Sequence, residues 1–356
     1  MKIEKKLLTD VVSKARIAVR AAAPIFLLRM MRVGICESGV DAFGSDIDIG
    51  IRAVSGKIDG AVYCCVNAAV FGDVLASMDD KEVGVELDER EMVLTGARSE
   101  FRLTTADASD YPDPPDYNPE RPSANLLGAF REVGFAAAGD GTRNLDAVYF
   151  DAENGFAAAT DGFRLAVKTF EFPTGIIVPL RALQMLNGIL EPDAPVGFET
   201  VGGSIVFESG NVLLRAQLYD YKYPDYTRIL QYDLADYAEH RVDRRVMMRA
   251  LRRCAIFGEA VLLEAGPGEI ILTASGDNGS VSDVINSDGD SKFCVRANAK
   301  YLIDAIEAAP GDDIIIRSAG FRAPIRLIAP AWQAAVMPVV YNEDLEGKDG
   351  QQIQTQ

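Results

Sequence analysis

The feature of this sequence that most restricts its fold is an internal repeat. Three segments each pass from an apolar, β-rich step into a short helix-like stretch, and they begin at Ala61, Thr174 and Lys292. When one valine of each segment is taken as equivalent, the repeats are 112 and 117 residues apart, at Val66, Val178 and Val295. Solenoid repeats are only about 20–45 residues long. The sequence therefore predicts three tandem domains of similar fold.

The residues that follow each helix-like stretch support the same register. Short segments with alternating apolar residues and glycine or acidic turns indicate strands, which makes the predicted class α+β. The first two repeats close on Tyr-Pro-Asp, at Tyr111 and Tyr223, and the third closes at Met337-Pro338. These closures predict domains over residues 1–118, 119–240 and 241–341, and a polar, disordered tail over 342–356.

Composition narrows the class of protein. Hydrophobic residues make up 48% and charged residues 25% of the 356 residues, which is typical of globular proteins. The five cysteines form no C-x-x-C pair, so we expect buried, reduced thiols and neither a metal site nor a cofactor. No apolar run is long enough for a membrane helix, and Glu4 and Asp10 lie where a secretory signal would be basic and then apolar. We expect a cytoplasmic protein.

Basic charge is concentrated in two helix-like segments. The net charge is −17, but residues 5–20 and 244–253 together carry +9, which leaves −26 for the remainder. On a helical wheel their cations cluster opposite the apolar residues, at Lys5, Lys6, Arg16, Arg20, Arg245, Arg249, Arg252 and Arg253. Such segments are often only solvated helix faces. Because they occur at equivalent places in the repeat, they also fit a surface that meets phosphates.

Several motifs in this register resemble the bacterial DNA polymerase III beta subunit, the sliding clamp family. They include A-T-D-G-F-R-L-A-V at residues 159–167, I-V-P-L-R-A-L at 177–183 and Y-K-Y-P-D-Y-T-R-I-L at 221–230. F-R-L-T-T from Phe101, A-N-A-K-Y-L-I-D-A-I from Ala297 and A-V-M-P near the C-terminus add to them. The resemblance covers residues 1–341.

The resemblance implies a head-to-tail homodimer that forms a ring of six similar domains, with helices inside and sheets outside. Such a ring encircles duplex DNA without sequence specificity and tethers the replicative DNA polymerase as a processivity factor in DNA replication, with no catalysis of its own. The cations named above would face the hole, and Arg143 would join them. Weak phosphate contacts would be enough, because the topology holds the ring on DNA.

The resemblance also implies a cleft between the second and third domains that binds short linear peptides. Its occupants would be the polymerase, the clamp loader, and repair polymerases or ligase. The matching positions are Leu145, Thr160, Gly162, Phe163, Arg164, Leu165, Pro224, Arg228, Ile229, Val336 and Met337. The alternative is that they are ordinary core at a domain junction. Phe163 replaces the histidine usual in the family, and this should reshape the cleft.

Ring closure in the family pairs an edge strand of the first domain with one of the third. The matching positions are Phe101, Leu103, Ile256 and Phe257. Phe101 and Leu103 could instead be inward-facing residues of a buried strand.

Two other functions compete with the clamp hypothesis. Asp46 and Asp48 in F-G-S-D-I-D-I-G form a D-x-D pair like that with which nucleotidyltransferases bind Mg²⁺. However, Gly44-Ser45 directly precedes Asp46, whereas those enzymes separate the two features, and Asp46 is also the repeat equivalent of Asp161. The second competitor is a tandem-domain interaction scaffold that does not bind DNA.

Overall fold

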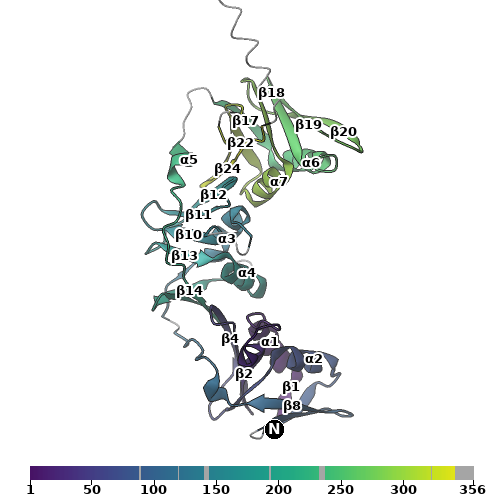
Figure 1. Cartoon of the computed structure of the whole chain (residues 1–356), viewed down its shortest axis with the longest axis vertical. Coiled ribbons are helices and arrows are strands. Elements are labelled where there is room, and N and C mark those ends of the chain that lie inside the picture. Colours follow the sequence, from purple (N-terminus) through teal and green to yellow (C-terminus); the bar gives the residue numbers. More distant parts are fainter. Residues whose placement is uncertain are drawn as a thin grey trace, which may run out of the picture. The chain divides into compact units, whose positions relative to one another are not determined.

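The structure is a computed structural model that describes residues 1–87, 90–118, 120–139, 144–191, 194–231, 237–321 and 323–340. The predicted tail and Arg143 lie outside these residues. The described chain forms two compact units. Figure 1 labels many of their helices and strands. Unit 1 comprises Met1–Gly128 and Arg181–Asp220, and unit 2 comprises Ala129–Leu180 and Tyr221–Gln356.

The first repeat contains a strand, a helix, four strands, a second helix and three strands. They are β1 (Lys2–Glu4), α1 (Lys5–Arg16), β2 (Met30–Cys36), β3 (Gly39–Ser45), β4 (Ile49–Gly56), β5 (Val62–Asn67), α2 (Ala68–Ser77), β6 (Glu82–Leu87), β7 (Glu91–Thr95) and β8 (Glu100–Ala106). Two short 3₁₀ turns, η1 (Phe26–Arg29) and η2 (Ala108–Asp110), lie between and after these elements.

The second repeat follows the same order. Its elements are β9 (Ser123–Ala124), α3 (Leu126–Val133), η3 (Gly134–Ala136), β10 (Ala147–Asp151), β11 (Phe156–Thr160), β12 (Arg164–Thr169), β13 (Ile176–Pro179), α4 (Leu180–Ile189), β14 (Val196–Val201), β15 (Ser204–Ser209) and β16 (Val212–Gln217).

The third repeat follows the short helix α5 (Thr227–Gln231). Its elements are β17 (Ala238–Asp243), α6 (Arg244–Cys254), β18 (Ala260–Gly266), β19 (Glu269–Gly276), β20 (Gly279–Asn286), β21 (Phe293–Asn298), α7 (Ala299–Ala308), β22 (Asp313–Ser318), β23 (Ile325–Ala329) and β24 (Trp332–Val336). The threefold recurrence of one element order confirms the repeat and the α+β class. The predicted boundary between residues 240 and 241 falls within β17, and the division into three domains stays a prediction.

Sheets join neighbouring repeats. In unit 1, β4 pairs antiparallel with β16, from Ile49 opposite Ala216 to Ala53 opposite Val212, within a 12-stranded sheet. In unit 2, β12 pairs with β24 in the same way, from Arg164 opposite Val336 to Lys168 opposite Trp332, within an eight-stranded sheet. A four-stranded sheet of β20, β19, β18 and β21 completes unit 2.

The first helix of the chain packs its apolar face into the core of unit 1. Leu8, Val11, Val12 and Ala15 are all buried, as the wheel predicts. The helix is shorter than the predicted segment, however, because after Arg16 the backbone continues with tighter bonds three residues apart. Val19 and Arg20 therefore lie beyond the helix.

Helix starts follow local sequence signals. The side chains of Asn67, Asp243 and Asn298 accept hydrogen bonds from backbone N–H groups three residues later, at the first turns of α2, α6 and α7. Asparagine and aspartate are preferred at this position because they satisfy N–H groups that have no partner within the helix.

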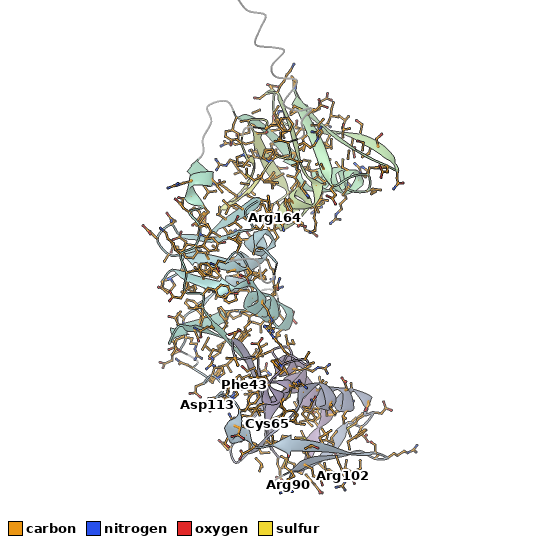
Figure 2. All side chains as sticks on the ribbon, viewed as in Figure 1. Phe43, Cys65, Arg90, Arg102, Asp113 and Arg164 are labelled. Atoms are coloured by element: carbon orange, nitrogen blue, oxygen red, sulfur yellow. The ribbon has the colours of Figure 1, made fainter. Side chains whose placement is uncertain are left out.

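The cysteine expectation needs one correction. Within the described residues no cysteine forms a disulfide, and four of the five thiols are buried, but Cys294 is exposed. It lies on β21, where Phe293 and Val295 point into the core, so strand alternation turns Cys294 outward. Burial raises the pKa of Cys64 and of Cys65, each to about 12. Figure 2 labels Cys65 beside Phe43, and both belong to a small buried cluster with Tyr111.

Candidate functional site

The motif A-T-D-G-F-R forms the tight turn between β11 and β12. One carboxylate oxygen of Asp161 accepts the backbone N–H groups of Phe163 and Arg164, both at 2.9 Å. Gly162 has φ +91°, a left-handed conformation that glycine adopts without steric cost. Thr160 donates its hydroxyl to the carbonyl of Arg164 at 2.7 Å, which closes the turn. We call Asp161–Arg164 the cleft turn.

The Y-K-Y-P-D-Y segment packs against this turn. The hydroxyl oxygen of Tyr223 accepts the N–H of Thr160 at 3.2 Å, and the ring of Tyr223 stacks on Tyr149 at 5.1 Å between centroids. Tyr226 donates its hydroxyl to the carboxylate of Asp151 at 2.7 Å. Tyr111 repeats the first contact in unit 1, where its hydroxyl oxygen accepts the N–H of Ser45.

The hydrogen bond between Tyr226 and Asp151 is reflected in both pKa values. Burial and the neighbouring carboxylate raise the pKa of Tyr226. Burial alone would raise the pKa of Asp151, but hydrogen bonds from Asn154 and Tyr226 outweigh it, so the pKa lies below its usual value. The pair is therefore a neutral phenol bound to a carboxylate near neutral pH.

The cleft turn and the tyrosine segment enclose an apolar cavity of about 320 Å³, which we call the cleft. Nine of the eleven predicted cleft residues line it: Leu145, Thr160, Gly162, Phe163, Arg164, Leu165, Pro224, Ile229 and Met337. Phe163 and Met337 form its exposed rim, at 61% and 44% exposure, and the N–H of Met337 donates to the carbonyl of Phe163 at 2.9 Å. All lining residues belong to unit 2.

Two predicted residues do not line the cleft. Val336 is fully buried. It directly precedes Met337, and consecutive side chains of an extended chain point to opposite faces, so its side chain lies on the face away from the cleft. The side chain of Arg228 is 85% exposed and forms an ion pair with Asp225 at 2.9 Å.

The structure adds Asp225, Tyr226 and Ala335 to the lining. Alternation from Met337 could have indicated Ala335, and Asp225 and Tyr226 directly follow the predicted Pro224.

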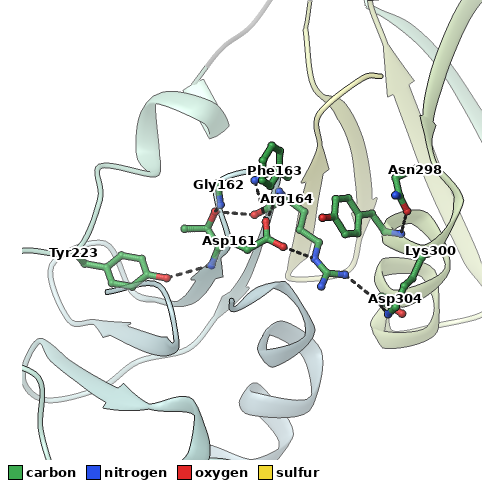
Figure 3. A network of polar contacts seen from close by, with 10 residues as sticks. Asp161, Gly162, Phe163, Arg164, Tyr223, Asn298, Lys300 and Asp304 are labelled. Atoms are coloured by element: carbon green, nitrogen blue, oxygen red, sulfur yellow. Dashed lines mark hydrogen bonds and ion pairs between the residues drawn. The ribbon is translucent and has the colours of Figure 1, made fainter. Parts of the chain in front are cut away.

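The side chain of Arg164 is enclosed by a polar network behind the cleft (Figure 3). Its Nε donates to Asp161 at 3.0 Å and its Nη1 to Asp304 of α7 at 2.6 Å. The guanidinium carbon lies 4.5 Å from the ring centroid of Tyr301 and 5.6 Å from that of Phe135. Arg164 therefore holds the cleft turn to a helix of the third repeat.

The predicted phosphate-binding residues of unit 1 are partly engaged by neighbouring groups. Arg16 forms an ion pair with Asp73 at 3.2 Å, and Arg20 with the buried Asp46 at 2.9 Å. The ammonium group of Lys5 donates to the backbone carbonyl of Met78. Lys6 is exposed and has no ion pair within the described part of the chain.

The predicted phosphate-binding residues of α6 in unit 2 are also partly engaged by neighbouring groups. The four predicted arginines are exposed, while Met247, Ala250 and Leu251 are buried on the opposite face. Three of the arginines have carboxylate partners: Arg245 with Asp312 at 3.5 Å, Arg252 with Glu307 at 3.5 Å, and Arg253 with Asp283. Arg249 forms no ion pair with a residue that the structure describes. Exposed pairs of this kind are weak, so a phosphate can compete for these cations.

The four predicted interface residues lie at or next to sheet edges. On β8, residues 100–104 pair only with β7, because β5 pairs with β8 at Thr105 and Ala106 alone. Leu103 is buried in the core of unit 1, whereas Phe101 is partly exposed. In unit 2, β20 is an edge strand of its sheet. The ring of Phe257 lies against Gly279 at the start of β20, and the neighbouring Ile256 is 73% exposed.

The carboxylates of the nucleotidyltransferase hypothesis do not form a metal-binding pair. Asp46 is buried, and its oxygens accept hydrogen bonds from Arg20, Arg181 and the N–H of Ile49, whereas Asp48 is exposed. Both lie in the turn between β3 and β4, so they do not share one face of a strand. Among the described residues, no group of three histidine, cysteine or acidic side chains could hold a metal ion.

None of the described helices is long and apolar enough to cross a membrane. Among curated proteins, the beta sliding clamp of Bacillus subtilis is 24% identical over 92% of this chain and 95% of its own length. Two crystal structures share the fold. The Bacillus subtilis DNA polymerase sliding clamp has a TM-score of 0.86, 24% identity, and coverage of 96% of this chain and 98% of its own. A DNA polymerase III beta subunit from Eubacterium rectale has a TM-score of 0.86, 19% identity, and coverage of 96% and 99%.

Two family models match the chain, and together they span more than half of it. The model of the DNA polymerase III beta subunit, N-terminal domain, matches residues 1–115, and that of the central domain matches residues 122–225. The chain therefore belongs to the bacterial DNA polymerase III beta subunit family.

Proposed function

We propose that this chain is a DNA sliding clamp, the non-catalytic processivity subunit of a bacterial replicative polymerase. Two copies close head to tail into a ring of six similar domains around duplex DNA, each copy contributing residues 1–118, 119–240 and 241–341. The observation that carries the proposal is the match of two family models to the first two repeats, together with the recurrence of their element order in the third.

The state of the basic residues fits a ring that slides. Five of the eight described cations have a carboxylate partner, and only Lys6 and Arg249 lack both an ion pair and a hydrogen bond within the described residues. At the five paired cations a phosphate has to replace an existing ion pair, so these contacts with DNA are weak and do not hold the ring in place. Arg143 contributes to the same surface in this proposal.

The cleft is the docking site for partner proteins. Its apolar lining and exposed rim suit a short peptide that buries one or two apolar side chains, and Met337 adapts to different shapes. The occupants are segments of the replicative polymerase, the clamp loader, and repair polymerases or ligase, all of which compete for this site.

Ring closure is by strand addition. The free edge of β8, near Phe101 and Leu103, pairs with the edge strand β20 of the second copy, near Ile256 and Phe257. An exposed strand edge offers unpaired backbone groups that a second chain can satisfy.

The deciding experiment compares retention on two forms of one DNA. The protein is loaded onto a nicked plasmid by the cognate clamp loader with ATP, separated from free protein by gel filtration, and the plasmid is then linearised with a restriction enzyme. We expect the dimer to remain on the circle and to be lost from the linear form. Equal retention on both forms would contradict encirclement, and failure to associate with either form would favour a scaffold that does not bind DNA.

A further inference from the structure

Asp304 lies outside the cleft, yet it holds a residue that lines it. The carboxylate is on α7, and its Oδ2 accepts a hydrogen bond from Nη1 of Arg164 at 2.6 Å (Figure 3). Arg164 lines the cleft, whereas Asp304 does not. The two residues are 140 positions apart in the sequence, in the second and third repeats.

The guanidinium of Arg164 has little freedom to do anything other than hold this geometry. Nε binds Asp161, Nη1 binds Asp304, and the rings of Tyr301 and Phe135 lie near its carbon. Only 11% of the side chain is exposed. A ligand carboxylate could recruit it only by breaking an existing charged pair, which is costly in a buried setting.

The backbone of Arg164 is held within the cleft turn. Its N–H donates to Asp161 and its carbonyl accepts the hydroxyl of Thr160, so its position fixes the cleft turn. The cleft turn presents Phe163 at the rim, where the carbonyl of Phe163 accepts the N–H of Met337. A displacement of Arg164 would therefore displace the exposed rim.

We infer that Asp304 is a positioning residue of the cleft, which acts through Arg164 and sets the affinity for partner peptides without touching them. The inference rests on the proposed role of the cleft in peptide binding. Side chains in one network of ion pairs are commonly coupled strongly enough to change an equilibrium severalfold. We expect Asp304→Asn to weaken peptide binding by about tenfold.

Lys300 provides a matched control on the same helix. Its ammonium group binds the same oxygen of Asp304 at 2.9 Å, but its side chain is 75% exposed. Lys300→Met thus removes an ion pair with Asp304 and leaves the pair between Asp304 and Arg164 intact. Exposed pairs contribute little, so we expect peptide affinity within about twofold of wild type.

The test is a double-mutant cycle on the full-length protein. The probe is the shortest segment of the cognate replicative polymerase that binds wild-type protein, labelled with fluorescein and titrated by anisotropy. Wild type, Asp304→Asn, Arg164→Met and the double variant are compared, with melting temperatures recorded for each. If Asp304 acts through Arg164, the double variant binds no more weakly than Arg164→Met alone.

The outcomes separate this inference from the proposed function. Wild-type affinity in Asp304→Asn, or losses that add in the double variant, would overturn the positioning role. If no polymerase segment binds wild type, the proposed function of the cleft fails instead. Should Asp304→Asn unfold at the assay temperature, Asp304→Glu replaces it: the longer side chain cannot keep the same distance to Nη1, so we expect about threefold weakening, and unchanged affinity would refute the inference.

Discussion

The exposed ring of Phe163 gives the sharpest test of where partner proteins dock. The side chain is 61% exposed at the rim of the cleft and has no aromatic partner among the described residues. Complete burial of a phenylalanine is worth about 1.5–3 kcal/mol, so covering the exposed part with a peptide would contribute roughly 0.9–1.8 kcal/mol. Phe163→Ala should therefore weaken peptide binding by about 5- to 20-fold, measured by fluorescence anisotropy.

Ile256 provides a control variant with the opposite expected effects. It is also an exposed apolar residue of unit 2, at 73% exposure, but it lies beside the edge strand β20 and not in the cleft. Ile256→Ala should weaken the dimer in sedimentation equilibrium and leave peptide affinity unchanged, whereas Phe163→Ala should do the opposite. Unchanged peptide affinity in Phe163→Ala, with the fold intact, would refute the assignment of the rim.

Leu165 would give a less informative variant, although it also lines the cleft. Only 1% of its surface is exposed, so a peptide can cover little more of it. Leu165→Ala would mainly leave a cavity in the core and lower the free energy of unfolding by about 2–5 kcal/mol. A loss of peptide binding in that variant would not distinguish contact from instability.

Three further outcomes follow from the structure. Arg249→Ala should weaken binding to a short duplex and reduce the slope of log affinity against log salt concentration by about 1. Arg253→Ala should change the slope less, because the guanidinium of Arg253 already binds a carboxylate. Equal effects of the two variants would contradict these ion-pair assignments. In the native protein Cys294 should react with a thiol reagent while Cys64 reacts only after unfolding, because it is buried and its pKa is about 12; reaction of Cys64 at the same rate would show that its burial is wrong. Because the pKa of Tyr226 is raised, its protonated hydroxyl stabilises the fold fully up to pH about 10 and less above it. Tyr226→Phe should therefore lower the free energy of unfolding in urea at pH 7 by about 1.5–3 kcal/mol and flatten the fall of stability above pH 10. An unchanged dependence of stability on pH would exclude this role.

Local patterns were sufficient to predict the helix faces, whereas the cleft residues were expected only from the resemblance to the sliding clamp family. Leu8 and Val11 are buried at the spacing that a helical wheel gives. The A-T-D-G-F-R motif forms a tight turn because its aspartate accepts backbone N–H groups and its glycine adopts a positive φ. The repeat was equally visible, since each copy must pack the same elements and therefore keeps the same apolar pattern.

Long-range pairs could not be predicted in this way. The bonds from Arg181 to Asp46 and from Arg164 to Asp304 join residues 135 and 140 positions apart, and no local periodicity specifies such partners. Val336 is absent from the cleft lining for another reason, because a shift of one residue along an extended chain exchanges its two faces.

The shared sheets have a consequence for how this chain can be divided. In the middle repeat, the edge strand β16 pairs with β4 of the first repeat, and the edge strand β12 pairs with β24 of the third. If residues 119–240 were expressed alone, they would have two unpaired strand edges, which readily pair with strands of other molecules. Although the sequence contains three repeats, a fragment with the middle repeat would have to include a neighbouring repeat to cover one of these edges. Transfer of the middle repeat alone into another protein would transfer both unpaired edges with it.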